Sequence, residues 1–226
     1  NRINVEIKSE SIKSDVFTDE EIKRILPILQ PDSSDSASAD NFLEFLLVNG
    51  MDFFKAVRAV IPSAWQNAPH MDPELRAFYE YHSTVFEAWD GPAAMAFTDG
   101  SQVGAVLDRN GRRPSRYYLT DDDLLILSSE VGVLELPEEQ VISKQRLEPG
   151  KMLLLDTEKG RIINDQELKA EIAAAEPYGQ WLKDELIELK DLKTKAEAEE
   201  SEIKDLQSSE LIKLQKSFGY SYEDLQ

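Results

Sequence analysis

Hydrophobic residues recur every three or four positions through the first 90 residues of the chain, a spacing typical of amphipathic helices. A short helix with an acid-rich first turn is predicted after Thr18. Three further helices are expected between residues 37 and 89, the second starting at Asp52 and the third at Asp72-Pro73. The apolar stripe predicted for the third helix consists of Leu75, Phe78, Tyr79, His82, Phe86 and Trp89.

After residue 92 the hydrophobic period shortens to two, which is typical of strands. Ala93–Thr98 and Gln102–Asp108 are expected to form a hairpin across Asp99-Gly100. Further strands are predicted at Ser115–Thr120, Leu124–Ser128, Lys151–Asp156 and Arg161–Ile163. Because these strands follow one another without intervening helices, the sequence predicts an antiparallel sheet and an α+β architecture.

The last 60 residues are helical in pattern and then largely charged. A helix is predicted over residues 166–175, and Pro177 is expected to break it. Residues 182–206 are dominated by Glu, Lys, Asp and Ala, which is typical of a solvated helix or a linker. Apolar residues return between positions 208 and 226.

The composition excludes several classes of function. The chain has 226 residues, with 25 Lys and Arg against 44 Asp and Glu, so its formal net charge is −19. This charge repels phosphate backbones and anionic lipid, so we expect neither a nucleic-acid nor a membrane partner. No apolar run approaches the roughly 18 residues that span a bilayer. The sequence contains no cysteine, which excludes disulfides, thiolate metal ligands and a cysteine nucleophile among these residues.

The two histidines do not indicate a catalytic or metal centre. His82 lies on the predicted apolar stripe of a helix, where a packed histidine is expected. His70 stands two residues before Asp72, but no third ligand accompanies this pair, so no metal site is predicted. No serine lies in a G-x-S-x-G nucleophile elbow, which argues against a serine hydrolase. No catalytic residue is therefore predicted within this chain.

Ser34-Asp35-Ser36 stands just before a predicted helix and has two interpretations. One is a helix cap, which stabilises a helix by about 1 kcal/mol. The other is a binding site in which the Asp35 carboxylate receives a cationic ammonium group. Residue spacing alone leaves both interpretations open.

Two later segments are more specific than their secondary structure requires. The stretch 89–93 is interpreted as a helix-to-strand junction in which Trp89 fills the core. In the stretch 107–117, a tight turn explains Asn110-Gly111. That turn does not explain the arginines beside Asp108 in an acidic chain, and we expect them to pair with internal carboxylates or a bound anion.

Six segments, taken in order along the chain, resemble the class II glutamine amidotransferase domain of the glutamate synthase large subunit. They are Ser34-Asp35-Ser36, Trp89-Asp90-Gly91-Pro92-Ala93, Asp108-Arg109-Asn110-Gly111, Arg113-Pro114, Ser129-Glu130-Val131-Gly132 and Leu147-Glu148-Pro149-Gly150. Six motifs in register are far more specific than any one of them. The resemblance covers residues 1–183. Residues 184–207 are interpreted as a charged linker, and residues 208–226 are similar to the start of the family's central domain.

The resemblance implies an N-terminal-nucleophile hydrolase fold. This fold is an αββα sandwich with antiparallel sheets, of which this chain is expected to be the incomplete C-terminal half. The implied reaction is hydrolysis of glutamine to glutamate, with ammonia passed to 2-oxoglutarate at a distant flavin site. FMN and an iron–sulfur cluster are implied for the full enzyme, and no cofactor is expected in this segment. The implied partners are the substrate glutamine and the remaining parts of glutamate synthase.

The resemblance also implies roles for individual residues. The family's N-terminal cysteine, His-Asn-Gly loop and carboxylate-binding arginine are missing from this sequence. They are expected upstream of Asn1, so the chain alone should be inactive. Asp35 matches the acid that holds the α-amino group of glutamine. Structural roles near the site are implied for Trp89, Asp108, Arg113 and Pro114. One position departs from the family pattern, because Arg112 stands where an aliphatic residue is usual.

Two other hypotheses remain open at this stage. In one, the chain is a free-standing relative without a nucleophile that acts as a binding or regulatory module. In the other, it is one of two chains that assemble into a whole domain. If the chain is instead part of glutamate synthase, as the resemblance implies, we expect a cytoplasmic protein or a plastid one. Missing strands would leave sheet edges exposed, so marginal stability or self-association is expected in isolation.

Overall fold

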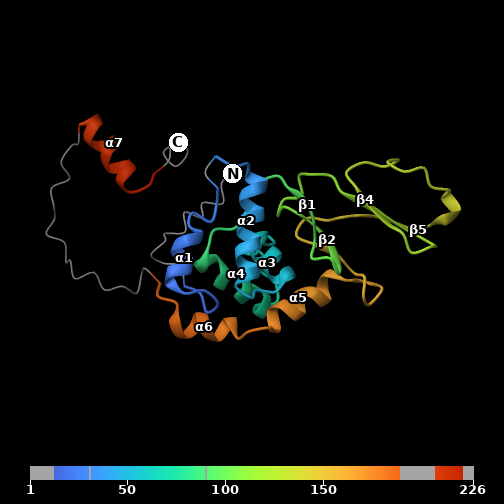
Figure 1. The fold of residues 1–226 in the computed structure, drawn as a ribbon, viewed down its shortest axis with the longest axis horizontal. Helices are drawn as coiled ribbons and strands as arrows, with labels where there is room; N and C mark the ends of the chain where they lie inside the picture. Colours follow the sequence, from blue (N-terminus) through green and yellow to red (C-terminus); the bar gives the residue numbers. More distant parts are fainter. Residues whose placement is uncertain (1–12, 31, 90, 189–206, 221–226) are drawn as a thin grey trace. The chain divides into compact units, whose positions relative to one another are not determined.

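The computed structural model describes residues 13–30, 32–89, 91–188 and 207–220 (Figure 1). The chain divides into two units, Asn1–Leu186 and Ile187–Gln226. In the second unit the described element is helix α7 (Ser208–Ser217), on which Leu211, Ile212 and Leu214 are exposed. The proposed linker lies largely outside the described residues. That residues 208–226 start another domain stays a prediction.

The first unit contains six α-helices within its described residues. They are α1 (Asp19–Ile25), α2 (Asp35–Val48), α3 (Phe53–Val60), α4 (Pro73–Val85), α5 (Asp165–Ala174) and α6 (Tyr178–Glu185). The side chains of Thr18, Asp52 and Asp72 cap α1, α3 and α4 by accepting backbone hydrogen bonds in the first turn. These starts confirm the sequence prediction.

Seven described strands form two antiparallel sheets, which confirms the predicted α+β architecture. The strands are β1 (Ala94–Thr98), β2 (Gln102–Leu107), β3 (Arg116–Thr120), β4 (Leu125–Ser128), β5 (Val141–Arg146), β6 (Met152–Asp156) and β7 (Arg161–Ile163). Sheet A has the order β1-β2-β6-β7, and sheet B has the order β4-β3-β5. The β1–β2 hairpin turns at Asp99, whose carboxylate accepts from the backbone of Ser101 and Gln102 at 2.9 and 2.7 Å.

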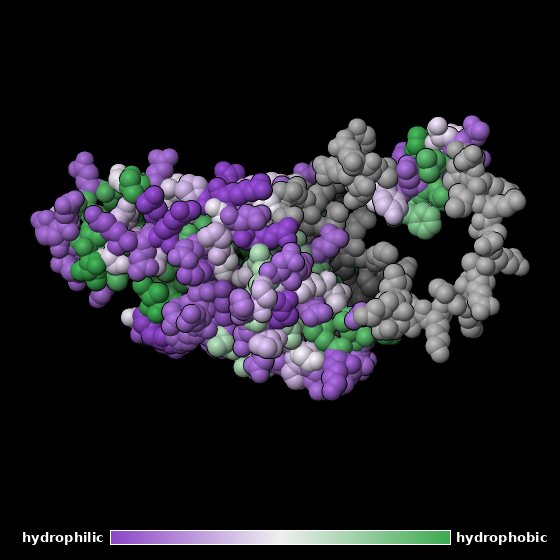
Figure 2. Space-filling view, turned by 180° about the vertical axis from the view of Figure 1, so that it is seen from behind, coloured by the Kyte–Doolittle hydropathy of each residue, from purple (hydrophilic) through white to green (hydrophobic). Residues whose placement is uncertain are grey.

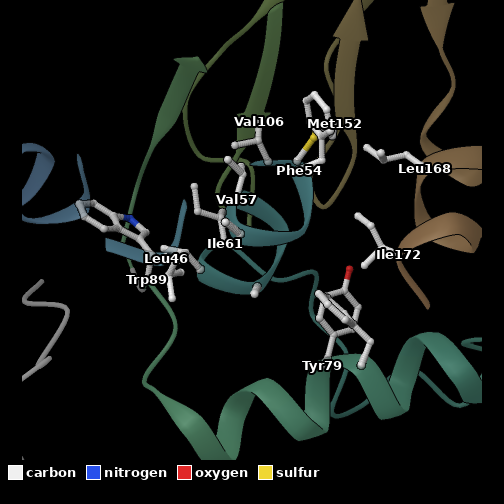
Figure 3. Close-up of a cluster of buried hydrophobic side chains, with 14 of the residues drawn as sticks. Leu46, Phe54, Val57, Ile61, Tyr79, Trp89, Val106, Met152, Leu168 and Ile172 are labelled. Carbon is white, nitrogen blue, oxygen red and sulfur yellow. The ribbon is translucent and has the colours of Figure 1, made fainter. Parts of the chain in front are cut away.

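The main core lies between the helices and one face of sheet A (Figure 3). Val106 and Met152 point from the sheet toward Phe54 and Val57 of α3, and Leu168 of α5 closes the side of this cluster. Strand side chains alternate between faces, so their neighbours Ala105, Leu107 and Leu153 point the other way.

A much smaller core lies on the second face of sheet A. Its buried members are Ala105, Leu107, Leu147 and Leu153, and the partly buried Tyr117, Leu125 and Leu127 of sheet B pack against them. Sheet B covers this face only in part. Along β1 the residues of that face, Ala94, Ala96 and Thr98, are exposed, and their neighbour Val103 is 45% exposed.

Three details differ from the sequence prediction. Helix α4 ends at Val85 instead of reaching residue 89, and Phe86 is already extended. Trp89 is buried from a non-helical segment, where its backbone N–H donates to the carbonyl of Val60 at 2.7 Å. Strand β5 was not predicted, because its residues VISKQR lack a clear apolar alternation.

Helix α6 follows α5 after the break at Pro177, and its Leu182 packs against the main core. Across the described residues, every helix is too short or too polar to cross a membrane.

Candidate functional site

Asp35 is the first residue of α2 and its side chain is exposed. The capping hydrogen bond of this helix comes from Ser34, whose Oγ accepts from the backbone of Ala37 at 3.2 Å. Ser34 and Ser36 also share a hydroxyl hydrogen bond of 3.1 Å. Ser34 therefore accounts for the N-cap, and the helix dipole stabilises the negative charge of Asp35. Its role in binding a ligand stays a prediction.

Asp108 is a buried carboxylate, 3% exposed, at the end of β2. One of its oxygens accepts from the backbone N–H of Ala93 and the other from that of Asn110, each at 3.0 Å. Its own N–H donates to the carbonyl of Ala93 at 3.0 Å. Asp108 thus connects the start of β1 to the turn after β2, and both carboxylate oxygens have backbone partners.

The turn at Asn110-Gly111 packs directly against the turn at Pro149-Gly150. Gly111 has a φ of +58°, and a Cβ at this position would lie 2.3 Å from Cγ of Pro149. The carbonyl of Gly150 accepts hydrogen bonds from Ser63 Oγ at 3.0 Å and from Lys169 Nζ at 2.8 Å. Two motifs separated by about 40 residues in the sequence therefore form one packed unit.

A cavity of about 290 Å³ lies beside this unit. Its walls come from the α3–α4 connection, α4, the segment before β1 and the turn after β2. Trp89 and Arg109, from two different motifs, both line it. Tyr79 and Ser63, two buried residues that also line the cavity, share a hydroxyl hydrogen bond of 3.0 Å. Asp35 is not among the lining residues.

Arg113 and Pro114 lie on the surface turn between β2 and β3, where both are exposed. Arg112 is exposed as well, so the larger side chain at this position does not disturb the packing of the turn. Of the residues assigned near the site, Trp89 lines the cavity, and Asp108 holds the turn that carries a second lining residue, Arg109. It leaves Arg113 and Pro114 at the surface.

His82 is a packed core histidine, as the sequence predicts. It is 4% exposed, and its Nδ1 donates to the carbonyl of Phe78 at 2.8 Å. Burial lowers the pKa of His82 to about 4, so the ring is neutral at pH 7. His70 is exposed. Among the described residues, no cluster of three or more His, Cys, Asp or Glu side chains is arranged to hold a metal ion.

A buried charge cluster behind the Gly150 turn was not predicted. Arg58 of α3 is fully buried and lies 3.5 Å from Asp165, which also pairs with Lys169 at 2.7 Å. The other hydrogen bond to Asp165 comes from the backbone of Met152 at 2.9 Å. Burial and the nearby Arg58 lower the pKa of Lys169. The signal in the sequence was an arginine inside the apolar run of residues 56–60.

Comparisons with known proteins identify the family. The model of class-II glutamine amidotransferases matches residues 1–181. The chain is 52% identical over 207 residues to the glutamate synthase (NADPH) large chain of Bacillus subtilis, covering 92% of this chain and 13% of that one. It is 47% identical over 171 residues to glutamate synthase (NADH) of Schizosaccharomyces pombe, covering 75% of this chain and 8% of that one. A third relative is the chloroplastic ferredoxin-dependent glutamate synthase of Oryza sativa. It is 39% identical over 205 residues, which cover 89% of this chain and 12% of that one.

The chain thus spans no more than 13% of the length of these three relatives. Their names agree with the resemblance carried by the six motifs, and they do not favour a separate binding module. The chain belongs to the class-II glutamine amidotransferase family and corresponds to an amidotransferase domain of the glutamate synthase type.

Proposed function

We propose that this chain is part of the glutaminase of a glutamate synthase and supplies the carboxylate that binds the α-ammonium group of glutamine. The observation that carries the proposal is the match to the amidotransferase family over residues 1–181, a range that includes Asp35. The assignment of Asp35 to the substrate-binding acid rests on the resemblance of its motif. The glutaminase would release ammonia for the reductive amination of 2-oxoglutarate elsewhere in the enzyme.

The position of Asp35 suits this role. Its carboxylate is exposed at the start of a helix that Ser34 already caps, so the acid is not needed as the N-cap. A hydrogen bond between an ammonium group and a carboxylate is charge-assisted and roughly twice as strong as a neutral one. Such a contact would fix the amino-acid end of glutamine while the amide end reacts.

The nucleophile in this proposal lies outside the sequence, because these 226 residues contain no cysteine. A thiol elsewhere in the polypeptide would attack the amide carbon of glutamine, and its proton would pass to the nitrogen, which leaves as ammonia. Water would then hydrolyse the thioester, which releases glutamate and restores the thiol. This chain alone should therefore not hydrolyse glutamine.

We also propose that further strands complete the sandwich of the N-terminal-nucleophile fold. Support comes from the second face of sheet A, where Ala94 and Ala96 are exposed and Val103 is 45% exposed. An apolar sheet face of this kind is normally covered. The residues of this chain do not fit an iron–sulfur cluster, since it has no cysteine, and none is assigned to FMN.

The test replaces Asp35 by Asn in the complete enzyme. A hydrogen bond to a charged group contributes about 1.5–3 kcal/mol, so the KM for glutamine should rise about 10- to 100-fold. Turnover with free ammonia as nitrogen donor should change far less. Asp40→Asn, the same change on the exposed side of α2, is the matched control and should leave KM unchanged. Equal losses with glutamine and with ammonia would show that Asp35 has a structural role instead.

A further inference from the structure

The two faces of sheet B differ in their surroundings. On the inner face, Tyr117, Leu125 and Leu127 pack against the small core of sheet A. On the outer face, the register places Ile126, Tyr118 and Lys144 side by side across the three strands. The next row on that face is Ser128, Arg116 and Arg146. The outer face thus combines apolar and cationic side chains and points away from the core.

The cations on this face are unexpectedly close to one another. Arg116 and Arg146 are direct cross-strand partners, and Lys144 is two residues from Arg146 on the same strand. Like charges directly opposite each other destabilise a sheet. All three residues are exposed, and no carboxylate in the described part of the chain forms an ion pair with them. In a chain with a net charge of −19, this cluster leaves local positive charge that could pair with an external anion.

An apolar hollow adjoins these cations. It has a volume of about 180 Å³ and is lined by Tyr118, Ile126 and Lys144 of the sheet and by Glu138, which forms no ion pair with the three cations among the described residues. Val133 and Leu134, from the β4–β5 connection, form part of its rim and are 55% and 53% exposed. Figure 2 shows apolar surface (green) among hydrophilic atoms at the left-hand end, where sheet B lies. Exposed apolar surface rimmed by charge is typical of a protein-binding site.

We propose that the outer face of sheet B docks an acidic segment of the same polypeptide, located outside residues 1–226, whose aliphatic side chain enters the hollow. This rests on the proposed function, in which the chain is one part of a much longer enzyme. The relatives support that premise, because the chain covers only 13% of the Bacillus subtilis protein. Carboxylates in the segment would neutralise Arg116, Lys144 and Arg146. The hollow favours a polypeptide over a nucleic acid, because its apolar lining suits an aliphatic side chain, which a nucleic acid does not have.

The test is zero-length carbodiimide cross-linking of the complete purified enzyme, followed by mass spectrometry. This reagent joins a lysine amine to a carboxylate in direct contact with it. Lys151–Glu148 and Lys169–Asp165, with N–O distances of 2.6 and 2.7 Å, are internal positive controls. We expect Lys144 to be joined to an Asp or Glu outside residues 1–226. In the variant Lys144→Arg, which keeps the charge but cannot form the amide, this cross-link should vanish while both controls persist.

A second measurement uses hydrogen exchange in the complete enzyme. Reversing all three charges, with Arg116→Glu, Lys144→Glu and Arg146→Glu, keeps like charges opposite each other within the sheet and should speed amide exchange in β3 and β5 at least about tenfold, whereas Lys183→Glu on α6 should not. The proposal is wrong if Lys144 cross-links only within residues 1–226, only to a second copy of the chain (detected by mixing isotopically labelled enzyme), or not at all while the controls react. Neither readout depends on glutaminase activity. If Asp35→Asn left the KM for glutamine unchanged, the expected cross-link and exchange rates would stay the same.

Discussion

The helical side of sheet A and the side that faces sheet B differ in how completely they are packed. On the helical side, residues from α2, α3, α4 and α5 bury the sheet, and Leu154 of β6 is fully inaccessible. On the other side the buried apolar cluster has four members among the described residues, and apolar side chains such as Val103 are exposed.

The same difference holds for charge. The buried cation Arg58 has its counter-ion, Asp165, inside the chain. On sheet B, Arg116 and Arg146 face each other across the strands without a carboxylate partner in the described residues. The helical side of sheet A is therefore covered by described residues of this chain, and the other side is the one that we propose to be covered by surfaces outside it. Three changes test this comparison.

The largest effect is expected from Asp165→Ala. It removes the shared counter-ion of Arg58 and Lys169 and the acceptor of the Met152 N–H. Breaking a buried ion pair typically costs about 3–5 kcal/mol, and urea unfolding of the 226-residue chain should show a loss of that size. Arg58→Met is the control and should cost less, because Asp165 keeps its ion pair with Lys169 at 2.7 Å and its hydrogen bond from the Met152 N–H, so no buried charge is left unpaired. Similar losses in both variants would mean that the cluster does not act through its charges.

The second comparison uses two neighbours on β6 that face opposite sides. Leu154 points into the main core and is fully buried, while Leu153 joins the small core and is 7% exposed. Leu→Ala substitutions in cores cost about 2–5 kcal/mol, depending on how well the site is enclosed. We expect Leu154→Ala to lie near the top of that range and Leu153→Ala near the bottom, by denaturant unfolding. A larger loss at Leu153 would show that the sheet B side is the better packed one.

The smallest effect concerns pH. His82 has a folded pKa of about 4, against an ordinary value of 6.5, so the unfolded chain binds an extra proton between these pH values. The stability contributed by neutral His82 is therefore complete above pH 6.5 and is lost as pH falls. Between pH 6.5 and 5 the loss should be about 1.5 kcal/mol.

The control for this pH effect is the other histidine. The loss attributed to His82 should disappear in His82→Phe and persist in His70→Gln, because His70 is exposed. Equal pH dependence in both variants would contradict the assignment. Because His82 packs in the helical side, the titration should also destabilise that side first, as hydrogen exchange can detect.

Local signals predicted the elements well where caps and turns mark them. Asp52 and Asp72 start α3 and α4, and Asp99-Gly100 turns the first hairpin. Prediction failed where tertiary structure decides. An apolar stripe cannot show that Trp89 is buried from an extended segment after the helix has ended. Strand β5 was missed because it lies at a sheet edge, where Ile142 is 62% exposed and no alternation is required.

The site was less predictable than the helices and strands, because most of its contacts join residues that are distant in the sequence. Local sequence identified Ser34-Asp35-Ser36 as a candidate cap just before a helix, and the structure makes Ser34 the cap and Asp35 the first residue of α2. The packing of Gly111 against Pro149 joins turns that are distant in sequence, so no local pattern reveals it. Arg58 was visible as a charge in an apolar run, but its partner Asp165 lies more than 100 residues away.

The most direct test of the account is a glutaminase assay of this chain beside the complete polypeptide. We predict that the complete polypeptide releases ammonia from glutamine and loses that activity on thiol alkylation. The 226-residue chain, which contains no cysteine, should release ammonia no faster than buffer. Ammonia release by the purified chain, insensitive to alkylation, would contradict the claim that the attacking thiol lies elsewhere in the enzyme.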